Sequence, residues 1–136
     1  MLEAGLTMNA RIEAEHALLR LHFTQTDYVE FGGMHWFLVG PLRTPENWSP
    51  DTILAAFSVT QGHPGAAPYG FYVPAELTFN GGPPSEHGAP HQPPFPGRWR
   101  FLSWNATNWQ ATADVSTGSN LWGWVRSFIH RLREGK

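Results

Sequence analysis

The distribution of proline is the feature that most constrains the fold of this chain. Nine of its twelve prolines lie between Pro64 and Pro96. Proline has no backbone N–H to donate and fixes its own φ angle, so a stretch this rich in proline cannot form a continuous helix or an inner strand. We therefore expect a long loop over residues 80–97, with the regular structure before and after it.

Residues 9–23 have the periodicity of an amphipathic helix. Asn9 is a suitable N-cap, because its side chain can accept a hydrogen bond from a backbone N–H of the first turn. The apolar stripe that we expect to pack on the core consists of Ile12, Leu18, Leu19, Leu21 and Phe23. The side that we expect to face solvent consists of Arg11, Glu13, Glu15 and Arg20.

A second helix is predicted near the end of the sequence. Its apolar positions fall on one helical face and are Leu121, Val125, Phe128, Ile129 and Leu132. Either Ser119 or Asn120 can cap its start. Basic side chains gather in its C-terminal half, where positive charge suits the helix dipole. This periodicity makes the closing helix the clearest element of the sequence.

Four segments between the helices have the composition of strands. They are residues 34–39 (closed by Gly40-Pro41), 52–60, 71–73 and 98–104. The apolar run at 52–60 is typical of a central strand that is covered on both faces. Residues 24–31 are expected to be a connector, 44–50 a turn and 105–118 irregular. The sequence therefore predicts one α+β domain over residues 1–136, with about four antiparallel strands and a flexible stretch at 1–8.

The composition argues against several classes of partner. The formal net charge is −2, so no basic excess indicates nucleic acid or an anionic membrane. No apolar stretch approaches the length of a membrane span, and the first residues lack the layout of a secretion signal. The absence of cysteine excludes disulfides and fits a reducing compartment. We expect a soluble cytoplasmic protein whose many aromatic rings serve a protein partner.

The seven histidines raise the question of a metal site. A zinc site needs three or four converging ligands at short spacing, and the sequence contains neither an HExxH motif nor a Cys/His pattern. We therefore expect no metal and no cofactor, and we interpret His63, His87 and His91 as polar turn residues. A phosphate-binding glycine loop and a GxSxG elbow are also missing.

Ser103 is the candidate for covalent chemistry, at the end of the strand predicted over 98–104. An activated serine hydroxyl can accept an acyl group, and Asn105 could donate a hydrogen bond to the developing oxyanion. Alternatively, Ser103 only ends the strand and bonds to the backbone. The residues taken alone favour this second interpretation.

Several segments, taken in order, carry a resemblance to a known family. They are residues 35–42, the strand at 53–59, Gly62-His63-Pro64 before the strand at 71–73, residues 74–77, residues 80–82, residues 99–105 and the closing helix at 121–132. Over residues 34–133 the chain resembles the E2, or ubiquitin-conjugating, family, and within it the cysteine-poor bacterial proteins called prokaryotic E2 family E. The resemblance implies a UBC fold and two partners, an E1-like adenylating enzyme and a ubiquitin-like protein.

The chain departs from the general E2 pattern at the reactive site. It has neither the His-Pro-Asn tripeptide nor the cysteine, and only Gly118 remains of the Trp-x-Pro-Gly motif that often follows. The resemblance then implies that Ser103 accepts the ubiquitin-like C-terminus as an oxyester, with Asn105 as oxyanion donor and His91, His87 or Asp114 as base. The hydroxyls that could replace Ser103 are those of Thr107, Thr112, Ser116, Thr117 and Ser119.

Two other functions stay open. In the first, the chain is a non-catalytic E2-variant adaptor, and Trp99, Trp104 and Trp109 form a docking surface for the ubiquitin-like protein or the E1-like enzyme. In the second, it is an aromatic-rich binding module outside ubiquitin-like conjugation. The resemblance favours covalent carriage through Ser103 over the adaptor.

Overall fold

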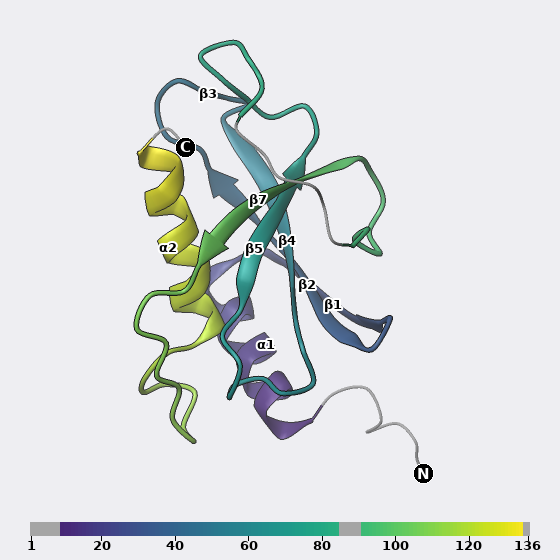
Figure 1. The fold of residues 1–136 in the computed structure, drawn as a ribbon, viewed down its shortest axis with the longest axis vertical. Helices are drawn as coiled ribbons and strands as arrows, with labels where there is room; N and C mark the ends of the chain where they lie inside the picture. The colour runs from purple at the N-terminus through teal and green to yellow at the C-terminus, as the bar shows by residue number, and fades with distance from the viewer. Residues whose placement is uncertain (1–8, 85–90, 135–136) are drawn as a thin grey trace.

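A computed structural model describes residues 9–84 and 91–134 of the chain. In this part the helices are α1 (Ala10–His22) and α2 (Leu121–Arg133). The strands are β1 (Gln25–Phe31), β2 (Met34–Arg43), β3 (Trp48–Ser49), β4 (Thr52–Val59), β5 (Tyr69–Pro74), β6 (Thr78–Phe79) and β7 (Trp99–Asn105). Five of them form an antiparallel sheet in the order β1-β2-β4-β5-β7, and β3 pairs with β6 (Figure 1). The α+β class is therefore confirmed.

Strand β1 was predicted as a connector, and this prediction was wrong. The strand pairs with β2 over its whole length, from Gln25 opposite Gly40 to Phe31 opposite Met34. Gly32 and Gly33 join the two strands with φ angles of 62° and 79°, which suits a tight hairpin turn. Because β1 is an edge strand whose residues are all exposed or half-buried, it lacks the apolar run that marks β4.

The Gly40-Pro41 pair does not close its strand as predicted. Strand β2 continues to Arg43, and its pairing with β4 shifts register between Val39 and Leu42. A Cβ atom on Gly40 would lie 3.0 Å from the Ile53 carbonyl oxygen and 3.2 Å from Leu54 Cα, so the close approach of the two backbones favours glycine here. The other three predicted strands are present, and the predicted turn at 44–50 also contains the short β3.

Both helices pack on the same face of the sheet (Figure 1). The first core cluster joins Ile12 and Leu19 of α1 with Val125 and Phe128 of α2 and with the sheet, for example at Phe57. As predicted, Asn9 and Asn120 cap the helices, accepting hydrogen bonds of 2.8 Å from the backbone N–H groups of the third helical residue in each case.

Two predictions for the faces of α1 were wrong. Leu21, expected in the apolar stripe, is 79% exposed, whereas Glu15, expected in solvent, is fully buried. Glu15 follows Ile12 by three residues and precedes Leu19 by four, so all three share one helical face. The charge of Glu15 is compensated by Arg11 of the same helix and by two partners outside it, which the sequence of α1 does not contain.

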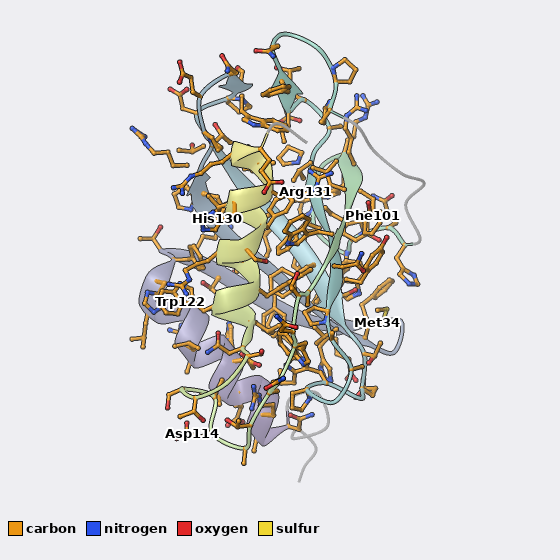
Figure 2. The ribbon with its side chains drawn as sticks, turned by 60° about the vertical axis from the view of Figure 1, so that its left-hand side comes forward. Met34, Phe101, Asp114, Trp122, His130 and Arg131 are labelled. Atoms are coloured by element: carbon orange, nitrogen blue, oxygen red, sulfur yellow. The ribbon has the colours of Figure 1, made fainter. Side chains whose placement is uncertain are left out.

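The proline-rich loop packs on the opposite face of the sheet. A second core cluster on this face consists of Trp36, Leu38, Ala56, Tyr72 and Phe101, with Phe95 and Trp99 packed against it. Figure 2 shows Met34 and Phe101 on the side of the sheet away from α2. Residues 80–84 and 91–97 contain no helix or strand, as the prolines predict; residues 85–90, including His87, lie outside the described residues.

Candidate functional site

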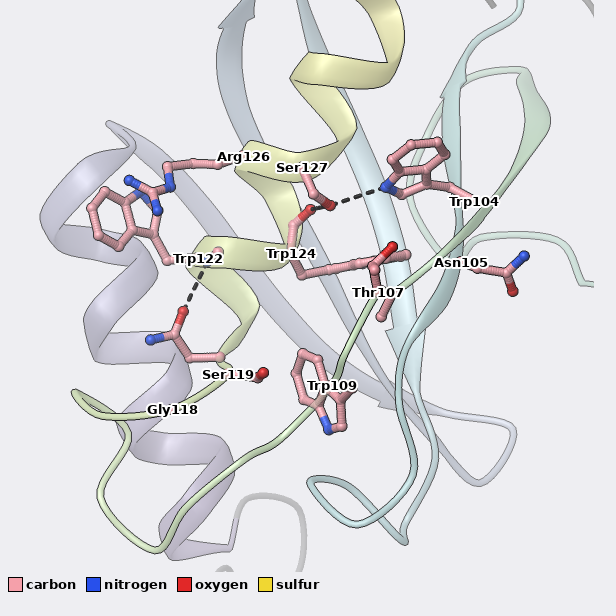
Figure 3. Close-up of a pocket in the computed structure, with 13 residues that line it drawn as sticks. Trp104, Asn105, Thr107, Trp109, Gly118, Ser119, Trp122, Trp124, Arg126 and Ser127 are labelled. Carbon is pink, nitrogen blue, oxygen red and sulfur yellow. Dashed lines mark hydrogen bonds between the residues drawn. The ribbon is translucent and has the colours of Figure 1, made fainter.

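A pocket of about 250 Å³ lies between the end of β7, the loop at 106–120 and the first turns of α2 (Figure 3). Four tryptophans contribute to its lining, Trp104, Trp109, Trp122 and Trp124, and the Trp122 ring points away from the other three, towards His22 of α1 (Figure 3). We call it the tryptophan pocket. Its polar lining includes Asn105, Thr107, Ser119, Arg126 and Ser127. Apolar walls with a few polar groups are typical of binding sites in proteins.

Trp104 is fixed against α2 by strand alternation and one hydrogen bond. Leu102 and Trp104 both pack on the helix-side core, as expected for alternate residues of a strand. The Trp104 Nε1–H donates to Ser127 Oγ at 2.9 Å, and that hydroxyl donates in turn to the Trp124 carbonyl at 2.7 Å (Figure 3). This chain of bonds joins the end of β7 to α2 across the pocket.

Trp109 forms the wall contributed by the loop. Its Nε1–H donates to the Pro64 carbonyl at 2.8 Å, and its ring lies 5.8 Å from the His63 ring between centroids. The turn after β4 therefore holds the loop that follows β7, although the two segments are far apart in the sequence.

Trp122 lies between two cationic or ionisable side chains. The His22 ring stacks on it with centroids 3.7 Å apart and planes 5° apart, and the Arg126 guanidinium carbon lies 4.3 Å from a ring centroid of the indole. Trp122 and Arg126 are four residues apart on α2, so they are neighbours on its surface. Stacking on the indole orients this guanidinium at the rim of the pocket.

Trp124 is almost completely buried and stacks on Phe71 at 4.9 Å. Its indole N–H has no hydrogen-bond partner among the described residues. A buried donor without a partner is uncommon in folded proteins and costs stability.

Ser103 lies in β7 between Leu102 and Trp104, and its side chain is half-buried. Because those two neighbours face the helices, strand alternation directs Ser103 to the opposite face, with Trp99 and Phe101. The hydroxyl is therefore not part of the lining of the tryptophan pocket. Asn105, at the end of β7, is exposed and does line it.

His91 lies on the same face of the sheet as Ser103. Its backbone N–H donates to the Tyr72 hydroxyl at 3.1 Å, and its ring meets Trp36 edge-on at 6.3 Å. Burial raises the pKa of Tyr72, so this phenol stays neutral near pH 7. The imidazole is exposed, which leaves it accessible from solvent.

Asp114 lies in an exposed turn of the loop, at the end of the molecule away from Phe101 (Figure 2). Its Oδ1 accepts hydrogen bonds from the backbone N–H and the hydroxyl of Ser116, at 2.9 and 2.7 Å. These two bonds, the backbone one foremost, lower the pKa of Asp114 below its usual value. A carboxylate with a lowered pKa is a weaker proton acceptor.

The alternative hydroxyls differ in their surroundings. Thr112 and Thr117 bond to each other and to carbonyls of the same turn, Ser116 bonds to Asp114, and Ser119 Oγ accepts from the Gln110 N–H. Thr107 is exposed and lines the tryptophan pocket.

Of the three tryptophans predicted to form one docking surface, only two come together. Trp104 and Trp109 line the tryptophan pocket, whereas Trp99 packs on the opposite face and donates its Nε1–H to the Phe95 carbonyl at 3.3 Å. The sequence analysis missed Trp122, Trp124 and Arg126. The i,i+4 spacing of Trp122 and Arg126 on the predicted closing helix is the signal that could have found that pair.

His63 lies in the turn after β4, as predicted, but it is buried, with its Nε2 2.8 Å from Glu15 Oε2. Among residues 9–84 and 91–134, His, Asp and Glu side chains nowhere gather in a group of three that could hold a metal ion. Within the same residues, neither helix has the length and apolar character needed to cross a bilayer. Comparison of the chain with protein-family models, with curated proteins and with solved structures gives no match.

Proposed function

We propose that this chain is an E2-like component of a bacterial ubiquitin-like conjugation pathway, and that the tryptophan pocket docks the ubiquitin-like protein. The observation that carries the proposal is the cluster of Trp104, Trp109 and Trp124 beside the end of β7, with Trp122 and Arg126 on the neighbouring surface of α2. Aromatic and arginine side chains dominate the energetics of protein interfaces. The order of elements, a helix, an antiparallel meander and a closing helix, also agrees with the family that the sequence resembles.

The geometry favours non-covalent docking, as in an E2-variant adaptor. Ser103 faces the side of the sheet opposite the tryptophan pocket, so a chain end held in that pocket does not meet its hydroxyl directly. Asp114 is also poorly suited as a base, because Ser116 already occupies its carboxylate.

Covalent carriage through Ser103 is the second candidate, favoured by the exposed His91 on the same face. In this reaction the Ser103 Oγ attacks the carbonyl carbon of a ubiquitin-like C-terminus held as a thioester on the E1-like enzyme. A C–O bond forms, the C–S bond breaks, the E1 thiolate leaves, and the serine proton passes to His91. The product is an oxyester on Ser103.

A single incubation distinguishes the two functions. The chain is mixed with ATP and with the E1-like enzyme and ubiquitin-like protein encoded nearest to its gene. Covalent carriage gives an adduct that survives thiol reductant, is cleaved by hydroxylamine, and disappears in Ser103→Ala but not in Ser116→Ala. Docking alone gives a complex without an adduct. If neither an adduct nor a complex forms, the proposal is wrong in both versions.

Docking at the tryptophan pocket is tested with Trp122→Ala. Loss of an interface tryptophan typically costs about 2 kcal/mol or more, so we expect the dissociation constant to rise roughly thirtyfold or more. Phe31→Ala is the matched control, because Phe31 is also an exposed ring, at 58%, but lies in β1 at the opposite edge of the sheet from β7. Equal affinities of the two variants, measured by calorimetry, would place the docking surface elsewhere.

A further inference from the structure

The carboxylate of Glu15 is a buried junction between distant parts of the chain. Its side chain is completely buried, and three donors point at it. Oε2 accepts from Arg11 Nε at 3.1 Å and from His63 Nε2 at 2.8 Å, and Oε1 accepts from the backbone N–H of Leu121 at 2.9 Å. One side chain of α1 thus contacts the turn after β4 and the first residue of α2.

The surroundings compensate the charge of this carboxylate. Arg11 supplies a guanidinium that is itself largely buried, and the Leu121 N–H belongs to the N-terminus of α2, where the helix dipole favours a negative group. A buried charge that loses such partners is strongly destabilised, so Glu15 requires these neighbours to stay in place.

Arg11 extends the junction into the loop that forms the tryptophan pocket. Its two terminal nitrogens donate to the carbonyls of Thr112, at 2.5 Å, and Ser119, at 3.2 Å. On the other side, His63 packs against Trp109, whose indole N–H is bound by Pro64. The loop at 106–120 is therefore held at both ends. Near its start, Trp109 contacts His63 and Pro64; further along, Thr112 and Ser119 bond to Arg11.

The contacts of His63 define its tautomer. Nε2 faces a carboxylate oxygen, which only accepts hydrogen bonds, so Nε2 must carry a proton. Nδ1 is buried with no hydrogen-bond partner among the described residues. A neutral ring protonated on Nε2 leaves only a lone pair at Nδ1, which costs less than a buried N–H without a partner.

We propose that Glu15, His63 and Arg11 are positioning residues for the tryptophan pocket, holding the loop in the arrangement that receives the partner. This inference depends on the proposed docking function only where it predicts an effect on partner binding. The geometry of the loop itself can be measured without any partner.

The first test is backbone amide hydrogen exchange by NMR on the full chain. In Glu15→Gln we expect the protected amides of residues 109–121 to exchange about tenfold faster or more, because local opening becomes easier, while β4 amides change much less. Glu13→Gln is the matched control, since Glu13 is an exposed residue of the same helix. Unchanged exchange in the loop of Glu15→Gln would overturn the inference.

Glu15→Gln could also destabilise the whole domain, so a second variant keeps the test decisive. Arg11→Gln removes the bonds to Thr112 and Ser119 and the charged partner of Glu15, but leaves the bonds from His63 and Leu121 to Glu15 available. We expect the loop amides to exchange faster by a larger factor than the β4 amides, and an equal rise in both would overturn the inference. Imidazole ¹⁵N spectra should show His63 as the Nε2–H tautomer in wild type and in Arg11→Gln. A His63 protonated only on Nδ1 would contradict the junction directly.

Binding separates this inference from the proposed function. With the ubiquitin-like protein used above as the probe, Arg11→Gln should raise the dissociation constant by the reciprocal of the closed fraction of the loop, which is about tenfold when the loop is closed about a tenth of the time. If exchange shows the loop mostly open in Arg11→Gln and the affinity is unchanged, the positioning role is wrong and docking survives. If wild type does not bind, docking fails, whereas the exchange and tautomer results still decide whether the junction holds the loop.

Discussion

At the scale of the residue, polar side chains of the helix-side layer form a chain of hydrogen bonds in which each donor and acceptor can be assigned. The Tyr28 hydroxyl lies 2.7 Å from His35 Nδ1, and His35 Nε2 lies 3.1 Å from Gln61 Oε1. The Gln61 amide nitrogen donates to Glu30 and to the Gly33 carbonyl, so its oxygen is the acceptor. His35 Nε2 therefore carries a proton, and in the neutral ring Tyr28 donates to Nδ1. This chain ties the hairpin of β1 and β2 to the turn after β4.

Tyr28 makes the free energy of unfolding depend on pH in the alkaline range. Burial, and next the charge of Glu30, raise the pKa of Tyr28 from 10.0 to about 12. Since the folded state disfavours the phenolate, this stabilisation is complete below pH 10 and is lost as pH rises through about 12. We expect the unfolding midpoint in denaturant to fall over this range, and to fall less steeply in Tyr28→Phe. Tyr69→Phe is the control; an equal slope in all three proteins would contradict the assignment.

At the scale of the element, one glycine allows β5 and β7 to pair. Gly70 has φ of 78° and lies where the pairing shifts register, between Tyr69 and Phe71. A Cβ atom there would lie 2.1 Å from Cζ and 2.3 Å from Cε1 of Phe101. The Phe101 ring thus lies directly over the bare backbone of β5, and any side chain at position 70 would displace it.

This packing predicts different costs for two glycines with similar backbones. Gly81 has φ of 83° and open space around its Cα, so Gly81→Ala should cost only the left-handed strain of about 1–2 kcal/mol. Gly70→Ala should cost this strain plus an overpacking penalty of about 1–3 kcal/mol. Denaturant unfolding of both variants measures the difference. Equal losses of stability would mean that the Phe101 ring moves aside freely.

At the scale of the whole molecule, two cores share one sheet. The helix-side cluster and the cluster under the proline-rich loop use alternate residues of the same strands, for example Phe37 and Leu38 of β2. If the packing on one face of the sheet is lost, the same strands lose support for the core on the other face. The shared sheet therefore couples the two layers into one cooperative unit.

We accordingly expect one thermal transition. Far-ultraviolet circular dichroism follows the backbone, and the near-ultraviolet signal follows the seven tryptophans, which lie on both faces of the sheet. The two melting curves should coincide, because a small single domain unfolds in one step. Near-ultraviolet signal lost at a lower temperature than far-ultraviolet signal would show that a layer separates before the sheet unfolds.

The sequence by itself determined the elements whose signals are local. Helix α2 follows from its periodic apolar face, the cap Asn9 from its position before the periodicity of α1, and β4 from its unbroken apolar run, whereas the structure chose Asn120 over Ser119 as the cap of α2. The proline-rich segment could be assigned as a loop for the same reason, since each proline removes a donor wherever it lies.

The tertiary structure alone decided the contacts between distant segments. It buried Glu15, because two of the three compensating groups come from His63 and the N-terminus of α2, and only Arg11 comes from α1. It also placed Ser103 on one face of the sheet and the tryptophan pocket on the other, because the pocket needs α2 to lie beside β7. Such pairings depend on how strands and helices meet in space, and no local pattern of residues contains that information.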